Sequence, residues 1–369
     1  MQNNLPGECE KLADLLKEPV SYGVFSGFDG FIDEVIHVVD QRRSVSEYTR
    51  IETIAEYAAR IAGAAGFSTN IEYVPIRVKS GGNGVIYANA LAQTGNSVFY
   101  AGALGEPIET VFLPLREVCR EVVSIAPSAH TDAVEFQDGK LIISKLQPLN
   151  EVTYERLTER IGREKLIDET GAAEMLAFAN WTMIPAMSDI WKRFIEEILP
   201  FAKRGGYAFF DLADPKKRRP EHVLEALRLI MRFQDFRRVV LGLNLAEARQ
   251  VAALLELEET EPERLTRDIR EALGLHGVVV HSVKESCAFL GETFAKIKAP
   301  YCTNPVLTTG AGDNFNAGFS NGLMRGLPAA ECLMLGTATA GYYVRTGQSP
   351  GCNELRRFLC DWGSGSLRG

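Results

Sequence analysis

Short apolar runs alternate along the chain with longer amphipathic stretches. The runs that predict buried strands lie at residues 22–25, 98–101, 207–211, 239–243 and 278–282. Between them, the stretches 188–203, 221–232 and 245–257 have the apolar spacing of helices packed on one side. Short apolar runs between helices are typical of strands that are buried on both faces of a parallel sheet. The pattern therefore predicts an α/β fold with a mostly parallel central sheet.

Other segments break this rhythm. Residues 34–40 and 71–79 read as extended, with a charged helical insert predicted at 46–63 between them. The sequence AVEFQDGKLIISKL predicts two strands that turn at Asp138-Gly139, which is a strong hairpin signal. We assign residues 34–40, 71–79 and 131–147 to a small β-sheet lid on a single domain that spans residues 1–369.

Composition limits the function further. With 40 Lys and Arg against 48 Asp and Glu, the net charge of −8 argues against a chain that coats nucleic acid or an anionic membrane. The sequence has no apolar run of the ~18 residues that a membrane span requires, and its start lacks the features of a signal peptide. The seven cysteines have no paired spacing, so no zinc site or disulfide framework is predicted. We expect a soluble, cytoplasmic protein.

The segment most informative about chemistry is TTGAGDNFNAG, residues 308–318. A glycine-rich turn runs directly into a helix, whose first N–H groups lack intrahelical partners and can bind a phosphate. Asp313 is unexpected there, because a carboxylate repels an anion. A carboxylate makes sense if it removes a proton from a hydroxyl that then attacks phosphorus. The alternative is that Asp313 only caps the helix.

This segment resembles the C-terminal signature of the ribokinase/PfkB carbohydrate kinase family, D-T-x-G-A-G-D-x-F. Two further segments are similar to family motifs in the same order along the chain. SGGNG at residues 80–84, with the helix that follows, resembles the N-terminal signature, and NLAE at 244–247 resembles an N-x-x-E element. The resemblance implies a ribokinase-like three-layer sandwich with a small β-sheet lid.

The resemblance also implies roles at the phosphate end of the site. Asp313 aligns with the catalytic base of the family, and Gly310, Ala311 and Gly312 align with its anion hole. Asn244 and Glu247 align with residues that organise Mg²⁺ through water near the phosphates of ATP. An N-cap asparagine followed by a first-turn glutamate is the alternative interpretation of that pair.

At the sugar end, Gly81 and Gly82 align with glycines that let the backbone approach the substrate. Asp33 falls where the family keeps a hydroxyl-binding aspartate, and a carboxylate can accept hydrogen bonds from two hydroxyls at once. Asp29 is a second candidate for substrate binding, and support of the local turn is its alternative role.

Two positions depart from the family pattern. Leu307 replaces an aspartate that helps to shape a monovalent-cation site, so we doubt activation by such a cation. Ile86 replaces an asparagine that contacts the sugar, and we assign its role to Asn83 or Asn89, with Asn83 included among the predicted substrate-binding residues.

The leading hypothesis is an ATP-dependent kinase that transfers the γ-phosphoryl group to a hydroxyl of a sugar or sugar-like molecule. The alternative is a kinase-like sugar sensor without turnover, which has no need of an anion-repelling carboxylate at residue 313. A dinucleotide-dependent oxidoreductase is excluded, because Gly23, Gly27 and Gly30 lack the G-x-G-x-x-G spacing. A homodimer formed through the lid is a further hypothesis.

Overall fold

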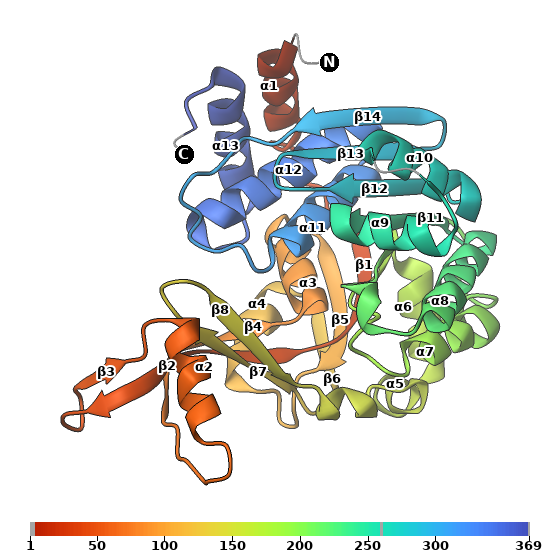
Figure 1. Ribbon diagram of the computed structural model, residues 1–369. Helices are drawn as coiled ribbons and strands as arrows, with labels where there is room; N and C mark the ends of the chain where they lie inside the picture. The colour runs from red at the N-terminus through yellow and green to blue at the C-terminus, as the bar shows by residue number, and fades with distance from the viewer. Residues whose placement is uncertain (1–3, 259–260, 368–369) are drawn as a thin grey trace.

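The computed structural model describes residues 4–258 and 261–367 and consists of a three-layer α/β body with a small β-sheet projecting from it (Figure 1). Within the described residues, the large sheet has nine strands. In spatial order they are β14 (Thr293–Lys298), β13 (Glu285–Leu290), β12 (Gly277–His281), β11 (Arg238–Asn244), β10 (Tyr207–Asp211), β9 (Met175–Phe178), β1 (Gly23–Phe28), β5 (Ser97–Ala103) and β6 (Glu121–Ala126). All neighbours from β12 to β6 are parallel, and β13 and β14 are antiparallel.

Helices cover both faces of this sheet, because its strands alternate apolar side chains to either side. In β11, for example, Val239 and Leu241 belong to one hydrophobic core and Val240 to the other. The first core is covered by α5 (Tyr154–Ile161), α6 (Arg163–Ala172), α7 (Met187–Arg193), α8 (Pro220–Arg232), α9 (Leu245–Leu254) and α10 (Pro262–Leu273). The second is covered by α1 (Leu5–Leu15), α3 (Asn83–Gln93), α4 (Leu113–Val118), α11 (Ala311–Met324), α12 (Ala329–Thr346) and α13 (Cys352–Ser364). The three-layer α/β prediction is therefore confirmed.

Short helical turns complete the body. They are the 3₁₀ turns η2 (Thr110–Phe112), η3 (Gln147–Glu151), η5 (Pro215–Lys217) and η6 (Phe233–Asp235), and the π-helical turn η4 (Phe194–Ile198). The helix expected over 188–203 therefore ends as α7 at Arg193 and continues only as η4.

Strand order reverses at β1, which pairs with β5 on one side and with β9 on the other. A crevice forms at such a switch point, beyond the carboxyl ends of the two strands, and this is where open α/β sheets bind ligands. Asp29 follows β1 there, and Asn180 follows β9. The sequence pattern missed β9, because a four-residue buried strand shows no alternation of polar and apolar residues.

The small sheet forms the predicted lid and lies beside α3 and β5 in Figure 1. Its strands run in the order β3-β2-β7-β8, and β4 pairs with β2. Their bounds are β2 (Phe31–Arg42), β3 (Tyr48–Arg50), β4 (Tyr73–Gly81), β7 (Ala129–Glu135) and β8 (Lys140–Lys145). The β7–β8 hairpin turns at Asp138-Gly139 as predicted, closed by a hydrogen bond from the Phe136 N–H to the Gly139 carbonyl oxygen.

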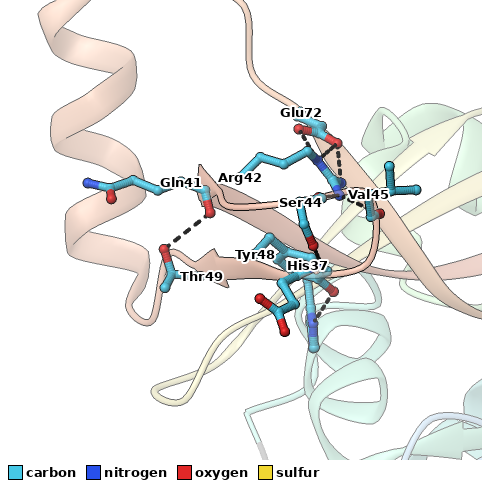
Figure 2. A network of polar contacts seen from close by, with 9 residues as sticks. His37, Gln41, Arg42, Ser44, Val45, Tyr48, Thr49 and Glu72 are labelled. Carbon is cyan, nitrogen blue, oxygen red and sulfur yellow. Dashed lines mark hydrogen bonds and ion pairs between the residues drawn. The ribbon is translucent and has the colours of Figure 1, made fainter.

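The insert between β2 and β4 is only partly helical. The expected helix over 46–63 is wrong at its start, because β3 occupies residues 48–50 and α2 (Ile54–Gly63) begins later. Thr53 and Glu56 fix that start through a reciprocal capping box. Figure 2 shows the far end of the lid, where the Arg42 guanidinium contacts Glu72 and donates to the Val45 carbonyl oxygen. A small core that includes Val38, Ile51, Tyr57, Val134 and Phe136 packs α2 against the lid.

Two expectations drawn from composition can be compared with the structure. In the described part of the chain, no helix is long and apolar enough to cross a membrane. All seven cysteines are free thiols in the structure.

The packing of α11 on α12 depends on Gly318. A Cβ atom there would lie 2.3 Å from Thr339 Oγ1 and 2.6 Å from the Leu335 carbonyl oxygen. Since overpacking of this kind forces helices apart, Gly318→Ala should lower the free energy of unfolding by about 1–3 kcal/mol in urea titrations. Gly63→Ala is the matched control, because nothing lies within 4 Å of its Cβ position. Equal stability of the two variants would show that the helices can separate without cost.

Candidate active site

Two cavities meet at the N-terminus of α11. One, of about 180 Å³, lies between the lid and the body, and we call it the lid cavity. The other, of about 320 Å³, lies between α11, α12 and the end of β12, and we call it the α12 cavity. Thr309, Gly310 and Asp313 line the first, whereas Thr308, Ala311 and Gly312 line the second. The loop that the sequence singled out therefore separates the two cavities.

Gly310 caps α11 with a backbone conformation that favours glycine, at φ 94°. A Cβ atom at this position would lie 2.8 Å from the Tyr343 hydroxyl oxygen and 3.0 Å from Ile86. That hydroxyl donates to the Thr309 carbonyl oxygen at 2.9 Å, which fixes the loop from α12. Of the predicted anion-hole amides, that of Ala311 already donates to the Thr308 carbonyl oxygen at 3.1 Å, so Gly310 and Gly312 are the stronger candidates to bind an anion.

Asp313 lies in the first turn of α11 and is 6% exposed. Asn83 Nδ2, from the N-terminus of α3, donates to Asp313 Oδ1 at 2.9 Å. Burial raises the pKa of the Asp313 carboxyl to about 8, with smaller contributions from the charges of Asp29 and Glu247, while the Asn83 hydrogen bond opposes the shift. The structure thus places a carboxyl with a raised pKa in the wall of the lid cavity, next to the loop that separates the two cavities.

Asp29 is fully buried, and protein groups surround its carboxylate. It accepts hydrogen bonds from the N–H groups of Asn83 and Gly84 at 2.9 and 3.0 Å and from Asn180 Nδ2 at 2.6 Å. The Tyr100 hydroxyl donates to the Asp29 carbonyl oxygen at 2.7 Å. Asp29 thereby joins the ends of β1 and β9 to the start of α3, an arrangement that matches the turn-supporting alternative. Burial still raises its pKa to about 6.

Asp33 lies on the face of β2 that lines the lid cavity. Its Oδ2 is 3.6 Å from Lys79 Nζ on the paired strand β4, and burial raises the pKa of its carboxyl while Lys79 opposes that shift. Gly81 is required beside it, since a Cβ there would lie 2.3 Å from Asp33 Oδ2. Gly82, at φ 105°, likewise leaves room for the Asp29 carboxylate. The glycine pair therefore admits two carboxylates close to the backbone.

Asn244 and Glu247 form the capping box of α9. Asn244 Oδ1 accepts from the Glu247 N–H at 2.9 Å, and Glu247 Oε2 accepts from the Asn244 N–H at 2.9 Å. Glu247 Oε1 accepts from the Asp214 N–H at 2.8 Å. Asp211 lies nearby, and burial, followed by the charges of Glu247 and Asp313, raises its pKa well above the usual range.

These carboxylates bear on whether a metal ion fits. Within the described residues, no group of His, Cys, Asp and Glu is arranged to ligate a metal directly. Asp211, Glu247 and Asp313 nevertheless form a group of buried, mutually repelling carboxyls, which a hydrated cation would stabilise. The residues therefore fit a metal held through water and not one bound directly.

His281, at the end of β12, lies against the glycine-rich loop that precedes α11. Its ring centroid is 4.8 Å from that of Phe315, and its Cε1 would lie 3.3 Å from a Cβ on Gly312. Burial lowers the pKa of this imidazole to about 4. The side chain therefore offers the α12 cavity a neutral ring near pH 7.

Several lining residues of the lid cavity were not predicted from the sequence. Asn180 holds Asp29 and lines this cavity, and the basic residues Arg77, Lys79 and Lys140 line it from the lid. The alternation of Arg77 with Lys79 in an extended segment was a signal that they share one face. No comparable signal marked Asn180, because the strand before it was not recognised.

Comparison with known proteins decides the family. A family model described as prokaryotic ketohexokinase matches residues 9–362. The ketohexokinase of Haloferax volcanii is 31% identical over 360 residues, which cover 95% of this chain and 94% of that protein. The chain belongs to the prokaryotic ketohexokinase family. It is a carbohydrate kinase, as the ribokinase/PfkB resemblance implies.

Solved structures confirm the ribokinase-like fold. The ribokinase of Thermotoga maritima has a TM-score of 0.62 at 18% identity and covers 92% of this chain and 99% of its own. Arabidopsis thaliana ribokinase, solved with ribose and ATP, has a TM-score of 0.63 at 18% identity with the same coverage. A Methanocaldococcus jannaschii nucleoside kinase has a TM-score of 0.62 at 13% identity and covers 92% of this chain and 99% of its own.

The raised pKa of Asp313 makes a prediction about stability. An unfolded aspartate has a pKa near ~3.9, so the folded state favours the neutral carboxyl and loses stability as pH rises from about 4 to about 8. Asp313→Asn keeps the shape and removes this loss. In urea titrations, its stability relative to the parent protein should increase by about 1–4 kcal/mol between pH 5 and pH 8.

Asp168→Asn, on the exposed surface of α6, controls for the general effect of removing one carboxylate. If the difference between Asp313→Asn and the parent protein did not change with pH, the Asp313 carboxyl would not be held neutral by the fold.

Proposed function

We propose that this carbohydrate kinase transfers the γ-phosphoryl group of ATP to a hydroxyl of a ketohexose. The observation that carries the proposal is the position of Asp313, a buried carboxyl at a helix N-terminus where two cavities meet. The family and the Haloferax volcanii relative are named for ketohexose phosphorylation, which supports this acceptor class. Membership of a kinase family also favours turnover over a sensor.

The two cavities differ in a way that suits the two substrates. The lid cavity offers polar groups for hydroxyls, including the Asp33 carboxylate and the Asn83 and Asn180 amides. The α12 cavity has largely apolar walls, including Phe315, Ala340 and Val344, which suit a nucleotide base. We therefore assign the acceptor to the lid cavity and ATP to the α12 cavity. The structure of Arabidopsis thaliana ribokinase with ribose and ATP supports a two-substrate site in this fold.

The chemistry follows from this placement. In its ionised form, Asp313 accepts the proton of the acceptor hydroxyl as that oxygen attacks the γ-phosphorus. The Gly310 and Gly312 N–H groups, aided by the dipole of α11, stabilise negative charge on the transferring group. Asn83 donates to Asp313 Oδ1, which leaves Oδ2 for the hydroxyl. Asp33 orients the acceptor from the lid.

Magnesium is assigned to Asn244 and Glu247, through water. The Glu247 oxygens each accept one backbone hydrogen bond, so their remaining lone pairs can accept from water on the ion. When bound, Mg²⁺ would neutralise charge on the nucleotide phosphates.

The two departures from the family pattern, Leu307 and Ile86, both line the lid cavity. An isobutyl group offers no oxygen ligand to a cation, which supports our expectation that no monovalent ion is required. Together these side chains make one part of the acceptor wall apolar, and the C–H faces of a sugar can pack there.

An acceptor panel tests the function. With ATP and Mg²⁺, ADP release should be fastest with a ketohexose and slower with an aldohexose, ribose or a nucleoside. Asp313→Asn should lower turnover of the best acceptor by ~10²–10⁴-fold because the proton acceptor is lost, with nucleotide binding retained. Normal turnover in this variant would exclude Asp313 as the base.

Asp33→Asn provides the contrast, since Asp33 contacts the acceptor and not the reacting bond. It should weaken acceptor binding by about 1.5–3 kcal/mol and leave ATP binding unchanged. A preference of the parent enzyme for a nucleoside or an aldose would contradict the ketohexose assignment while leaving the kinase reaction in place.

A further inference from the structure

The two cavities differ sharply in positive charge. Among the described residues, no lysine or arginine lines the α12 cavity, and its only histidine, His281, is neutral near pH 7. A bound triphosphate carries several negative charges, and phosphoryl transfer is catalysed chiefly by stabilising such charge. The α11 N-terminus supplies only partial positive charge. A cationic side chain that reaches the reacting group must therefore come from outside this cavity.

The lid supplies every basic side chain that lines the lid cavity within the described residues, namely Arg77 and Lys79 from β4 and Lys140 from β8. Two of them already have carboxylate partners. Lys79 Nζ is 3.6 Å from Asp33 Oδ2, and Lys140 Nζ is 3.1 Å from Glu135 Oε1. No described residue forms an ion pair or a hydrogen bond with the Arg77 guanidinium.

Arg77 lines the same cavity as the proposed phosphoryl end of the site. It lies across from Val35 in the β2–β4 ladder, on the same face as Lys79, and lines the same cavity as Gly310 and Asp313. The positive charge of Arg77 also affects the pKa of Tyr343. Burial raises the pKa of that phenol, and the Arg77 charge opposes the shift. The Tyr343 hydroxyl contacts the loop before Gly310, and this loop lines the same cavity as Arg77.

We propose that Arg77 is a catalytic residue of the lid, which donates hydrogen bonds to the transferring phosphoryl group once both substrates are bound. This inference rests on the proposed phosphoryl transfer. In that step, the bond from the γ-phosphorus to the β–γ bridging oxygen breaks, and a bond from phosphorus to the acceptor oxygen forms. The hydroxyl proton passes to Asp313, and ADP leaves. Arg77 stabilises charge on the equatorial phosphoryl oxygens and is unchanged at the end.

The proposal would make phosphoryl transfer depend on the presence of the acceptor. Arg77 is on the lid, so it is held over the phosphoryl group only when the lid contacts an acceptor through residues such as Asp33 on the neighbouring strand. ATP bound without an acceptor would lack this positive charge, and its transfer to water would stay slow.

The test compares Arg77→Met, Arg77→Lys and Arg77→Ala with the parent enzyme. Loss of a positioned donor at a transition state costs about 10²–10³-fold in kcat. We expect Arg77→Met to lose kcat in that range while the KM for the acceptor changes by less than about threefold, because the contact forms mainly in the transition state. Arg77→Lys should recover part of the loss, and added guanidinium should partly restore Arg77→Ala. A purely structural role would not show such rescue.

Arg43→Met is the matched control, because Arg43 is an exposed lid arginine outside both cavities. Its kinetics should equal those of the parent enzyme. Unchanged kcat in Arg77→Met, at normal thermal stability, would overturn the proposal. A rise in acceptor KM without loss of kcat would also overturn it, and would indicate that Arg77 binds an anionic acceptor instead. If the parent enzyme phosphorylated no sugar, the proposed function itself would fail, which separates the two outcomes.

Discussion

The site depends on keeping the Asp313 carboxyl buried at the N-terminus of α11. Burial and the neighbouring Asp29 and Glu247 carboxyls all disfavour its ionised form, whereas the Asn83 hydrogen bond and a backbone hydrogen bond favour it. A carboxyl with a pKa near 8 is a far better proton acceptor than an ordinary aspartate, which suits the role of base that we propose for Asp313. The glycine loop that precedes Asp313 lines both cavities, with Gly310 in the wall of one and Gly312 in the wall of the other.

Asp29 connects this arrangement to the topology of the sheet. Strand order reverses between β1 and β9, so the connections after these two strands run in opposite directions and leave a crevice at their carboxyl ends. The Asp29 carboxylate crosses that crevice by accepting from Asn180 and from the start of α3. Because the same helix start carries Asn83, the position of Asp313 is tied to the switch point through two side chains. A structural aspartate thus supports the proposed catalytic one.

Local motifs located the candidate site better than they predicted its surroundings. Asp313 and the Gly310–Gly312 turn could be recognised because one short segment holds both the glycines and the carboxyl. The contact from Asn83 spans 230 positions along the chain, which no local pattern encodes. Asn180 could not be predicted because β9 is too short to show a hydrophobic period. The predicted helix of the insert starts several residues before α2, because β3 and the Thr53 cap lie within a charged stretch. Arg77 was within reach of the sequence, since the segment had been assigned to the lid, but its partner-free state is visible only in three dimensions.

The pH dependence of kcat/KM for the best acceptor tests the central role of Asp313 most directly, because this quantity reports ionisations of the enzyme form that binds the acceptor, before the acceptor is bound. With ATP and Mg²⁺ kept saturating, it should rise about tenfold per pH unit below the pKa of the base and level off above it. The account predicts that this bend lies near pH 8, where burial places the Asp313 carboxyl, and that it disappears in Asp313→Asn. A profile that is flat between pH 6 and pH 9, or a bend that persists in Asp313→Asn, would contradict it.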